Sequence, residues 1–385
     1  MNPNFLNESQ VEWLDVVNKF MDNEITIEYV RKCDSERAYP YEAYEKIAKQ
    51  GWLGILIPEE EGGSGGDIFD YSLMAEGLGK FGFDFACSVI VPTFTAINII
   101  KHGSEEQKAR YVKPFIDGQI RFSVSISEPD AGSDAANTKT RARRDANGDW
   151  IVSGSKLWCS GAAAKNTVIA MLVRTDTSDK HGGLSVLLVP NDLPGVEIRT
   201  LPTLSRHATG STEIFLDEVR VPADALLGKE GQGWKVITEH LELERCAGAA
   251  AYVGNAQQAV TAANKYAHER IQFGKPIYEF QVIKHMLAEN QTRVDAARLL
   301  CYRAAHMKAQ GIPAARETSM AKLYSSETLK QCALDGMQIL GGYANLPEAD
   351  MERYLRESIQ STVGGGTSQI QRTIIAKSMR LKSTA

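Results

Sequence analysis

The sequence predicts an α+β protein with three consecutive parts: an N-terminal α-helical domain over residues 1–120, a middle antiparallel β domain over 121–228, and a C-terminal four-helix bundle over 229–385. Three observations predict this order. Apolar residues recur at helical spacing in the first part, short β-branched runs follow, and long amphipathic patterns return in the last part. A chain of 385 residues is long enough for two or three domains with sizeable cores.

The helical pattern of the first part runs from Asn7 to about Gly118, with Leu, Ile, Tyr and Phe at three- and four-residue spacing. The glycine-rich stretch Gly62–Asp67 interrupts it. This stretch lacks the Lys-Ser/Thr ending of a phosphate-binding loop and has no flanking βαβ unit. It therefore indicates a plain interhelical loop.

The middle part alternates short strand-like runs with turn residues such as Asn147-Gly148 and Gly182-Gly183. The expected strands are Phe122–Ser127, Trp150–Ser153, Thr167–Val173, Leu184–Val189 and Glu213–Val221. Together they indicate an antiparallel sheet or a small barrel. The basic run Arg141–Arg144 is interpreted as a solvated strand edge.

Long amphipathic helices are expected in the last part at Trp234–Ala267, Gln281–Gln310, Ala314–Leu340 and Thr367–Leu381. Four such helices in sequence predict a bundle. The alanine-rich run Ala247–Tyr252 indicates a closely packed, buried helix segment.

Composition excludes several classes of function. A net charge of -5 and a pI near 5.9, without a long Lys/Arg run, argue against extended nucleic-acid binding. The six cysteines are scattered and no two histidines have metal-ligand spacing, so we expect reduced thiols and no protein-bound metal. We expect no apolar stretch to approach the roughly 20 residues that span a bilayer. Without a recognisable targeting segment, a cytoplasmic location is the default expectation.

Five motifs, in the right order along nearly the whole chain, resemble those of the acyl-CoA dehydrogenase family. They are Ser125–Asp134 (SISEPDAGSD), Lys156–Ser160 (KLWCS), Glu269–Gly274 (ERIQFG), Gln338–Gly342 (QILGG) and Gly366–Gln371 (GTSQIQ). The resemblance implies that family's three-part fold and an FAD-dependent oxidoreductase acting on acyl-CoA. It also implies a homotetramer in which FAD lies across a subunit boundary.

The resemblance assigns flavin contacts to four residues in the middle part. Ile126 and Ser127 would offer backbone and hydroxyl contacts to the polar edge of the isoalloxazine, and Trp158 and Ser160 would flank its ring. For Trp158, the alternative is a core aromatic residue between the sheet and the bundle.

Further FAD contacts are implied in the last part. Arg270, Gln272 and Phe273 would approach the cofactor of a neighbouring subunit. The remaining positions are Gln338, Gly341 and Gly342 at the adenosine half, and Thr367 and Gln369 at the dinucleotide of their own subunit. The alternative for Arg270 is an ion pair with Glu269 at a helix end, worth about 0–1 kcal/mol if exposed.

Gly365 occupies the position where most members of the family carry the catalytic glutamate that removes the substrate α-proton. Glu244, in Leu241-Glu-Leu-Glu-Arg245, resembles the helix position from which the isovaleryl-CoA and long-chain acyl-CoA dehydrogenases supply this base. Its burial beside substrate would raise its pKa and strengthen it as a base. The alternative is a surface glutamate on an acidic helix that also carries Glu239 and Glu242.

Other residues are implied in binding the thioester. Ser133 and Arg245 resemble positions that meet coenzyme A, although Arg245 could instead pair with a nearby carboxylate such as Glu242. The backbone N–H of Gly365 would bind the thioester oxygen. Gly366 lies beside it, and the glycines at 364–366 leave volume for a branched, cyclic or bulky acyl group.

The leading functional hypothesis is α,β-dehydrogenation of an acyl-CoA, with the α-proton going to Glu244 and the β-hydride to FAD N5. Electron-transferring flavoprotein is the expected electron acceptor. The crotonobetainyl-CoA reductase branch has a similar glycine and helix glutamate, so reduction of an enoyl-CoA is an alternative. A lyase or desulfinase without net flavin reduction and a non-catalytic acyl-CoA-binding subunit are the others.

Overall fold

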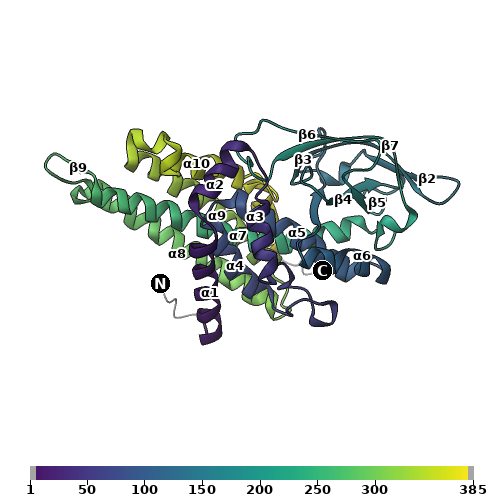
Figure 1. Ribbon diagram of the computed structural model, residues 1–385, viewed down its shortest axis with the longest axis horizontal. Coiled ribbons are helices and arrows are strands. Elements are labelled where there is room, and N and C mark those ends of the chain that lie inside the picture. The colour runs from purple at the N-terminus through teal and green to yellow at the C-terminus, as the bar shows by residue number, and fades with distance from the viewer. Residues whose placement is uncertain (1–5, 380–385) are drawn as a thin grey trace, which may run out of the picture. The chain divides into compact units, whose positions relative to one another are not determined.

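The structure is a computed structural model that describes residues 6–379 (Figure 1). The chain forms two compact units. The helical unit comprises the residues up to Arg31, Asp67–Ala86 and the residues from Arg245 onward, and the sheet unit comprises Lys32–Gly66 and Cys87–Glu244. The N-terminal helices are thus divided between the two units. The sequence boundaries near residues 120 and 228 stay predictions.

The sheet unit is built around an eight-stranded sheet, in the order β6-β7-β3-β2-β4-β5-β8 with β1 paired to β4. The strands are β1 Arg121–Ser125, β2 Arg141–Arg144, β3 Trp150–Ser160, β4 Thr167–Arg174, β5 Leu184–Pro190, β6 Val196–Thr200, β7 Ser211–Val221 and β8 Leu226–Leu227. Most pairs are antiparallel, as the turn signals predict. The β1–β4 pair is parallel and joins strands distant in sequence, so no hairpin connects them.

Burial within the sheet follows the sequence pattern. Strands β4 and β5 are continuous apolar runs whose residues are almost all buried. By contrast, β2 buries only Ala142 among its arginines, so the expected solvated strand is confirmed. The expectation that it forms a sheet edge is wrong, because β2 pairs with β3 on one side and, at Arg141, with β4 on the other. Trp150, Met171 and Ile214 belong to the apolar core of the sheet. Helix α6 (Glu105–Ile116) covers β1, because the Phe115 and Phe122 rings lie 5.4 Å apart.

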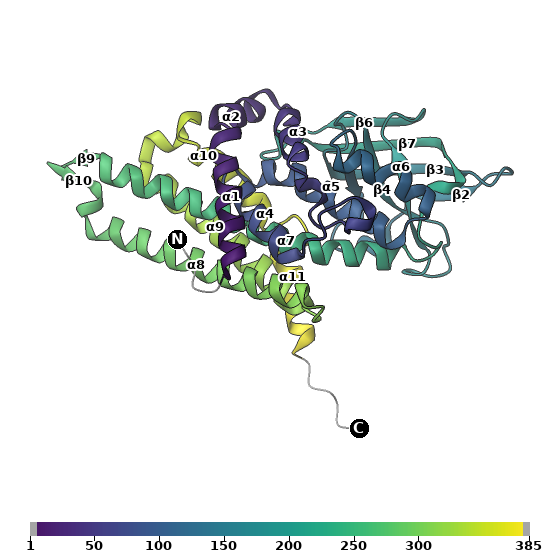
Figure 2. The same cartoon turned by 60° about the horizontal axis from the view of Figure 1, so that its bottom comes forward.

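The helical unit confirms the expected C-terminal helical domain. Its helices are α1 Glu8–Glu24, α4 Ile68–Gly79, α8 Gln281–Ala309, α9 Ala315–Leu340, α10 Met351–Ser361 and α11 Ser368–Ser378. Helix α7 (Gly233–Glu269) begins in the sheet unit and continues here. Figure 2 shows α8 beside α9, which also contacts α10 and α11. The shorter helices α2 Ile27–Glu36 and α3 Tyr41–Lys49, and α5 Phe83–His102, complete the set in the described chain.

The sequence pattern missed α10 and extended α11 too far. Helix α10 has apolar residues at helical spacing (Met351, Tyr354, Leu355 and Ile359), but it is short and mostly polar, so the sequence analysis did not identify it. Helix α11 ends at Ser378, and the last two residues expected in it lie outside the described residues.

Helix α5 corrects the expectation that no apolar stretch reaches membrane-spanning length. It is 20 residues long with a mean hydropathy of 1.7 over its most apolar window, of which 94% is buried inside the protein. The polar residues Thr93, Thr95 and Asn98 interrupt the apolar run, but the average hydropathy of the helix stays as high as that of a membrane-spanning helix. A long helix in a protein core can be as long and as apolar as a membrane-spanning helix. The burial of α5 inside the protein therefore accounts for its apolar composition.

Helices α4 and α7 approach closely through glycines. A Cβ added at Gly254 would overlap the carbonyl oxygen of Glu76, and one added at Gly79 would overlap the carbonyl oxygen of Ala251. The alanine-rich segment of α7 is fully buried, as its composition predicts. The small residues therefore set the distance between these two backbones.

Gly254→Ala should lower the free energy of unfolding by about 1–3 kcal/mol, because the added methyl group has to push α4 away from α7. Gly248→Ala is the matched control in the same helix, since its Cβ would meet only the Phe83 ring at 3.6 Å. That variant should be neutral or slightly stabilising. Chemical denaturation measures both. Equal effects of the two substitutions would contradict the close-approach account.

Candidate active site

Trp158 is held out of the core by a bulge in β3. The β3–β7 register shifts between Leu157 and Cys159, and Trp158 has φ +63°. Its side chain is 56% exposed, although tryptophan is usually well buried. Trp158 is therefore an uncovered aromatic surface in the sheet unit and does not take the core position that was the alternative.

The segment next to Trp158 is fixed by a buried ion pair. Lys156 Nζ lies 2.9 Å from Glu128 Oε1 and donates to the carbonyl oxygen of Ile126 at 3.3 Å. The Glu128 carboxylate also accepts hydrogen bonds from the backbone N–H groups of Lys139 and Thr140. These contacts hold Ile126 and the residues after it in one conformation.

The surroundings of Glu128 favour its charged form. Burial by itself would raise the pKa of the Glu128 carboxyl, but the charge of Lys156 and the hydrogen bonds lower it overall. Burial lowers the pKa of Lys156, and Glu128 opposes that shift. Burial also raises the pKa of the Cys159 thiol to about 11, so this thiol is protonated at neutral pH.

The other predicted contacts of the sheet unit lie along the same segments. Ser127 is half-buried and its carbonyl oxygen accepts a hydrogen bond from Leu157 N at 2.9 Å. Ser160, at the end of β3, is also half-buried, and its carbonyl oxygen accepts from Ser123 Oγ at 2.8 Å. Ser133 lies on the exposed loop after Glu128. Both serines thus lie close to Trp158 along β3: Ser160 ends this strand, and Ser127 is hydrogen-bonded to it at Leu157.

A cavity in the helical unit gathers four of the residues assigned to FAD. Arg270, Gln272, Gly341 and Gly342 line a pocket of about 440 Å³. Sequence reasoning missed the other residues of its wall, which are Tyr266, Ile277, Ile339, Leu340, Tyr343 and Leu346. Tyr343 directly follows Gly341 and Gly342, and this position in the sequence could have identified it as part of the wall. Gln338 is exposed but is not part of this wall.

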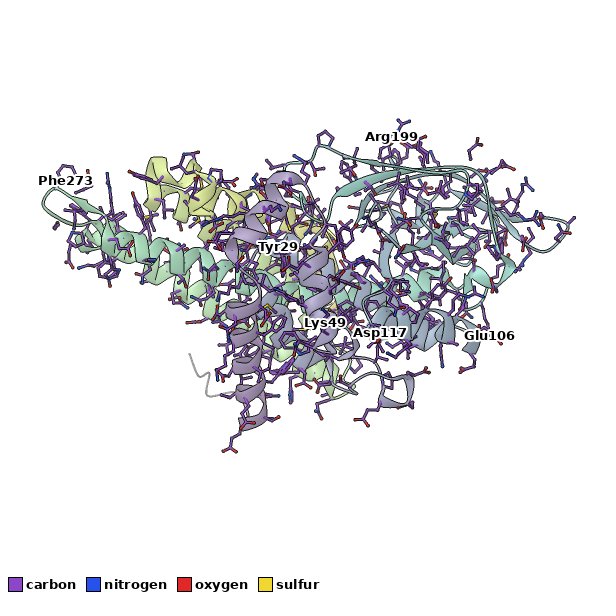
Figure 3. All side chains as sticks on the ribbon, in the orientation of Figure 1. Tyr29, Lys49, Glu106, Asp117, Arg199 and Phe273 are labelled. Carbon is purple, nitrogen blue, oxygen red and sulfur yellow. The ribbon has the colours of Figure 1, made fainter. Side chains whose placement is uncertain are left out.

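Arg270 faces an aromatic ring. Its guanidinium carbon lies 5.7 Å from the centre of the Tyr343 ring, and within residues 6–379 it forms no ion pair with Glu269. The short strands β9 Ile271–Gln272 and β10 Lys275–Pro276 form a hairpin beyond it. Phe273 sits at the hairpin tip with φ +52° and is 92% exposed (Figure 3). A hairpin that presents a bare phenyl ring has the character of a contact surface.

The glycine loop at residues 364–366 is held by its carbonyl oxygens. Arg245 Nε donates to the Gly365 carbonyl at 2.7 Å, and Lys322 Nζ donates to the Gly366 carbonyl at 2.9 Å. Gln371 Nε2 donates to the Gly366 carbonyl at 3.0 Å. Arg245 therefore binds a backbone carbonyl. The buried Lys322 lies in none of the sequence motifs, so the sequence analysis did not identify it.

Gly365 combines an available donor with open space. Its φ of +66° favours glycine, and a Cβ placed there would meet no atom within 4 Å. In the part of the chain that the structure describes, its N–H donates no hydrogen bond. The equivalent Cβ at Gly366 would lie 2.9 Å from Gln371 Nε2, so Gly366 offers no free volume, whereas one at Gly364 would only touch Gln360 at 3.4 Å.

Glu244 belongs to a buried polar chain in the sheet unit. Glu244 Oε2 lies 3.0 Å from His240 Nε2, and His240 Nδ1 lies 3.0 Å from Asn98 Nδ2. The His240 side chain is fully buried, whereas that of Glu244 is 19% exposed. Glu244 is therefore half-buried and hydrogen-bonded rather than a freely solvated surface glutamate.

The remaining predicted positions lie at the start of α11. The Thr367 side chain accepts a hydrogen bond from Ile370 N at 3.2 Å and so caps the helix. Gln369 is exposed, and its carbonyl oxygen accepts from Thr373 Oγ1. This helix start directly follows the glycine loop, so its position depends on the same carbonyl contacts.

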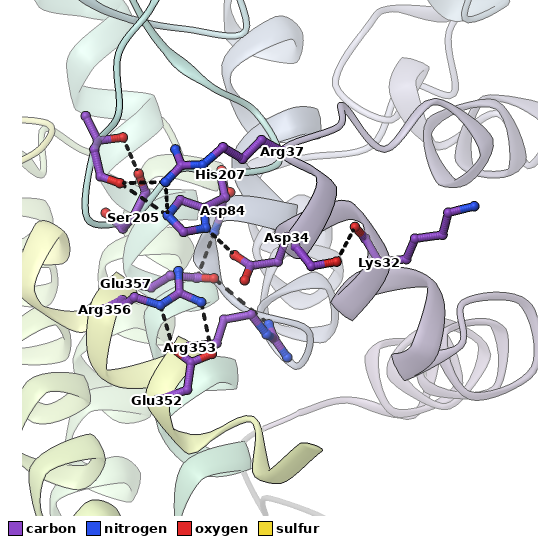
Figure 4. A network of polar contacts seen from close by, with 12 residues as sticks. Lys32, Asp34, Arg37, Asp84, Ser205, His207, Glu352, Arg353, Arg356 and Glu357 are labelled. Atoms are coloured by element: carbon purple, nitrogen blue, oxygen red, sulfur yellow. Dashed lines mark hydrogen bonds and ion pairs between the residues drawn. The ribbon is translucent and has the colours of Figure 1, made fainter. Parts of the chain in front are cut away.

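Two further polar networks contain no predicted site residue (Figure 4). In the sheet unit, His207 Nδ1 lies 3.3 Å from Asp34 and His207 Nε2 lies 3.1 Å from Arg37. In the helical unit, Arg356 pairs with Glu352 along α10 at 2.6 Å. Within residues 6–379 no group of three or more His, Cys, Asp or Glu residues is arranged to hold a metal ion.

The donors and surfaces described here fit FAD. An isoalloxazine needs an aromatic wall, which the exposed Trp158 offers. A pyrophosphate and an adenosine need a cation, amide donors and close backbone approach, which Arg270, Gln272 and the Gly341-Gly342 pair offer in one cavity.

Three models of the acyl-CoA dehydrogenase family match the chain in order. The N-terminal domain model matches residues 7–119, the middle domain model 123–219 and the C-terminal domain model 231–380. The chain therefore belongs to the acyl-CoA dehydrogenase family.

Similar proteins match the chain along nearly its full length. The probable acyl-CoA dehydrogenase YngJ of Bacillus subtilis is 36% identical, over 95% of this chain and 96% of YngJ. Subunit CarC of the caffeyl-CoA reductase-Etf complex of Acetobacterium woodii is 33% identical, over 93% of this chain and 94% of CarC. A solved FAD complex of PigA has a TM-score of 0.91 and 28% identity, over 98% of this chain and 99% of PigA.

The protein is an FAD-dependent oxidoreductase, and its homologues support acyl-CoA dehydrogenation as its general chemistry. This agrees with the family, fold and cofactor that the sequence motifs imply.

Lys156→Met should destabilise the sheet unit by about 3–5 kcal/mol, because it leaves the Glu128 carboxylate buried without its cation. FAD retention should fall with it, since the Ile126–Glu128 segment loses its anchor. Lys139→Met is the control, because Lys139 pairs with Asp130 at an exposed site. Thermal unfolding and the flavin-to-protein absorbance ratio measure both effects. A Lys156→Met protein as stable as the Lys139→Met protein would contradict this role.

Proposed function

We propose that this enzyme removes the α-proton of an acyl-CoA with Glu244 and forms an α,β-unsaturated thioester. The Cα–H bond breaks to give its proton to the carboxylate, and the Cβ–H bond breaks with its electron pair, so a carbon–carbon double bond forms. FAD, when bound, supplies the two-electron acceptor for that hydride. The observation that carries the proposal is Glu244, a half-buried carboxylate next in the chain to the arginine that holds the Gly365 carbonyl.

Glycine at position 365 leaves the chain in need of another base, because it has no proton-accepting side chain. Glu244 immediately precedes Arg245 in α7, and Arg245 Nε donates to the Gly365 carbonyl. A carboxylate at 244 is thus linked by one peptide bond to the residue that fixes the loop. General-base catalysis requires a base within hydrogen-bond reach of the proton that it removes.

The Gly365 N–H is proposed to stabilise the thioester oxygen. An α-C–H is too weak an acid for an ordinary carboxylate unless negative charge on that oxygen is stabilised. This N–H has no partner among the described residues, while the carbonyl of the same residue is held by Arg245 and Gln371. A fixed peptide plane with an available donor suits that task.

The open space at Gly365 supports an acyl group that is branched, cyclic or otherwise bulky. A Cβ at this position would meet nothing within 4 Å, so this wall of the helical unit lacks the side chain that most of the family has there. Ser133 and Arg245 remain proposed coenzyme A contacts, and Gly366 a proposed substrate contact.

Electron-transferring flavoprotein is the proposed partner for flavin reoxidation. The name of the relative CarC places that protein in a reductase-Etf complex, which supports such a partner here. The same name makes reduction of an enoyl-CoA the second candidate direction. In that direction protonated Glu244 would return the proton to the α-carbon. We retain a cytoplasmic location as part of the proposal.

A homotetramer with FAD shared between subunits is also proposed. The exposed Phe273 hairpin borders a cavity that holds an arginine, an amide and two exposed glycines. A second copy would cover the ring, and its cofactor would complete the cavity. Closed symmetric assemblies are the usual way to satisfy such surfaces.

Glu244→Gln should retain the fold, FAD and acyl-CoA binding, because the amide has nearly the same shape. Flavin reduction by the true substrate, measured anaerobically by stopped-flow, should fall by roughly 10²- to 10⁴-fold. Glu239→Gln is the control on the same helix and should reduce flavin normally. Normal reduction by Glu244→Gln would exclude this base assignment.

Arg270→Ala should weaken FAD retention and shift the oligomer toward smaller species, because cofactor and interface are proposed to stabilise each other. Lys275→Ala, in the same hairpin, is the control, since Lys275 lies over Phe280 and outside the cavity wall. Gel filtration with light scattering gives mass and flavin content together. A monomer that holds FAD tightly would defeat the shared site.

A further inference from the structure

His240 is a fully buried residue that is hydrogen-bonded to Glu244, and the proposed reaction assigns it no role. The two residues lie four apart on α7, and Asn98 and Phe94 lie four apart on α5. The Phe94 and His240 rings meet edge-on at 6.3 Å. The imidazole thus packs against an aromatic ring and has a polar partner at each nitrogen.

We infer that His240 is a positioning residue for the Glu244 carboxylate, and this inference rests on the proposed function. It donates one hydrogen bond from Nε2 to the carboxylate oxygen Oε2. The bond restricts the rotamers of Glu244, so that its other oxygen is presented in one direction.

Asn98 selects the tautomer that makes this donation possible. The Asn98 Nδ2 amide donates to His240 Nδ1 at 3.0 Å, so that ring nitrogen accepts. A neutral imidazole that accepts at Nδ1 carries its proton at Nε2. The Nε2–H then points to Glu244 at 3.0 Å. Asn98 thus donates to His240, and His240 donates to the Glu244 carboxylate.

The burial of His240 indicates that its hydrogen bonds to Asn98 and Glu244 have a role beyond packing. Burying an imidazole costs free energy unless both nitrogens are satisfied, and an apolar side chain would fill the same space between α5 and α7 without that requirement. His240 is 0% exposed, so it reaches a substrate only through Glu244. It therefore acts on the base and is not itself the base.

A second His–Glu contact of α7 provides the comparison: His240 and Glu244 both lie on α7, whereas this contact joins α5 to α7. His102 Nε2 lies 3.1 Å from Glu239 Oε2, with the side chains 18% and 37% exposed. That pair involves neither Glu244 nor an amide that selects a tautomer. His102→Phe is therefore a matched control for loss of a His–Glu contact of α7.

The test measures α-proton removal separately from oxidation. An acyl-CoA analogue with sulfur in place of the β-carbon has no β-hydrogen to transfer, so exchange of its α-hydrogen with deuterium oxide reports the proton step alone. Mass spectrometry follows the exchange on the FAD-loaded protein, and calorimetry gives the Kd of the analogue. Stopped-flow flavin reduction by the true substrate is the second rate. The variants are His240→Phe, His240→Gln, His102→Phe and Glu244→Gln.

His240→Phe should slow exchange and flavin reduction by roughly 10- to 100-fold, typical for loss of a supporting hydrogen bond, while the Kd of the analogue stays unchanged. His240→Gln retains an N–H donor and should recover most of the rate. His102→Phe should match wild type. Recovery by glutamine separates positioning from packing, because the glutamine side chain does not reproduce the ring.

Wild-type exchange in His240→Phe, with exchange abolished in Glu244→Gln, would overturn this inference and leave the base in place. Wild-type exchange in Glu244→Gln would instead overturn the proposed function. If His240→Phe also loses FAD or analogue binding, its slow exchange could come from that loss, and the exchange rate of His240→Gln then tests the positioning role. Slow exchange in His240→Gln with intact binding would then overturn the positioning role.

Discussion

The hydrogen bond from Arg245 Nε to the Gly365 carbonyl is the interaction on which the candidate active site depends. Three glycines in a row have little conformational preference of their own, and two of them have positive φ. Arg245, Lys322 and Gln371 bind its carbonyl oxygens and so help to give the loop a defined structure. Holding the carbonyl side of these peptides leaves the Gly365 N–H available for a ligand.

The same constraint explains how a side chain can be absent at position 365 without loss of order. In a loop with a side chain there, packing of that side chain can fix the backbone. Here the fixing groups come from α7, α9 and α11, and the space at Gly365 stays open. The buried pair of Glu128 and Lys156 does a similar job in the sheet unit, where it shapes the segment before Trp158. Both sites use buried charge to fix backbone around a ligand surface.

The sequence predicted much of this architecture, for physical reasons that differ between elements. Short β-branched runs between turn residues identified the main strands of the sheet, and apolar residues at helical spacing identified the long helices, because these elements bury apolar side chains. Helix α10 was missed because it is short and mostly polar, although its apolar residues recur at helical spacing. The apolar content of α5 was underestimated because Thr93 and Asn98 interrupt its run.

The site was predicted from motifs, and its supporting contacts were not. Motifs named Arg270, Gly341 and Gly342, which share a cavity, and Trp158, which is exposed. They gave no signal for Lys322 or His240, because neither belongs to a motif and both depend on contacts with residues distant in sequence: Lys322 with the glycine loop and His240 with Asn98. Arg245 was named for the substrate, yet its visible contact is to the loop. The assignments of individual residues to FAD and to the thioester stay predictions.

A crystal structure of the Glu244→Gln protein with FAD and unreacted acyl-CoA would test the central claim most directly, because the trapped complex shows which side chain faces the α-carbon. We predict that the side-chain amide introduced at position 244 lies roughly 3–3.5 Å from that carbon, a distance typical of reacting atoms, with the Gly365 N–H at the thioester oxygen. A complex in which the side chain at position 244 points away and another carboxylate faces the α-carbon would contradict it.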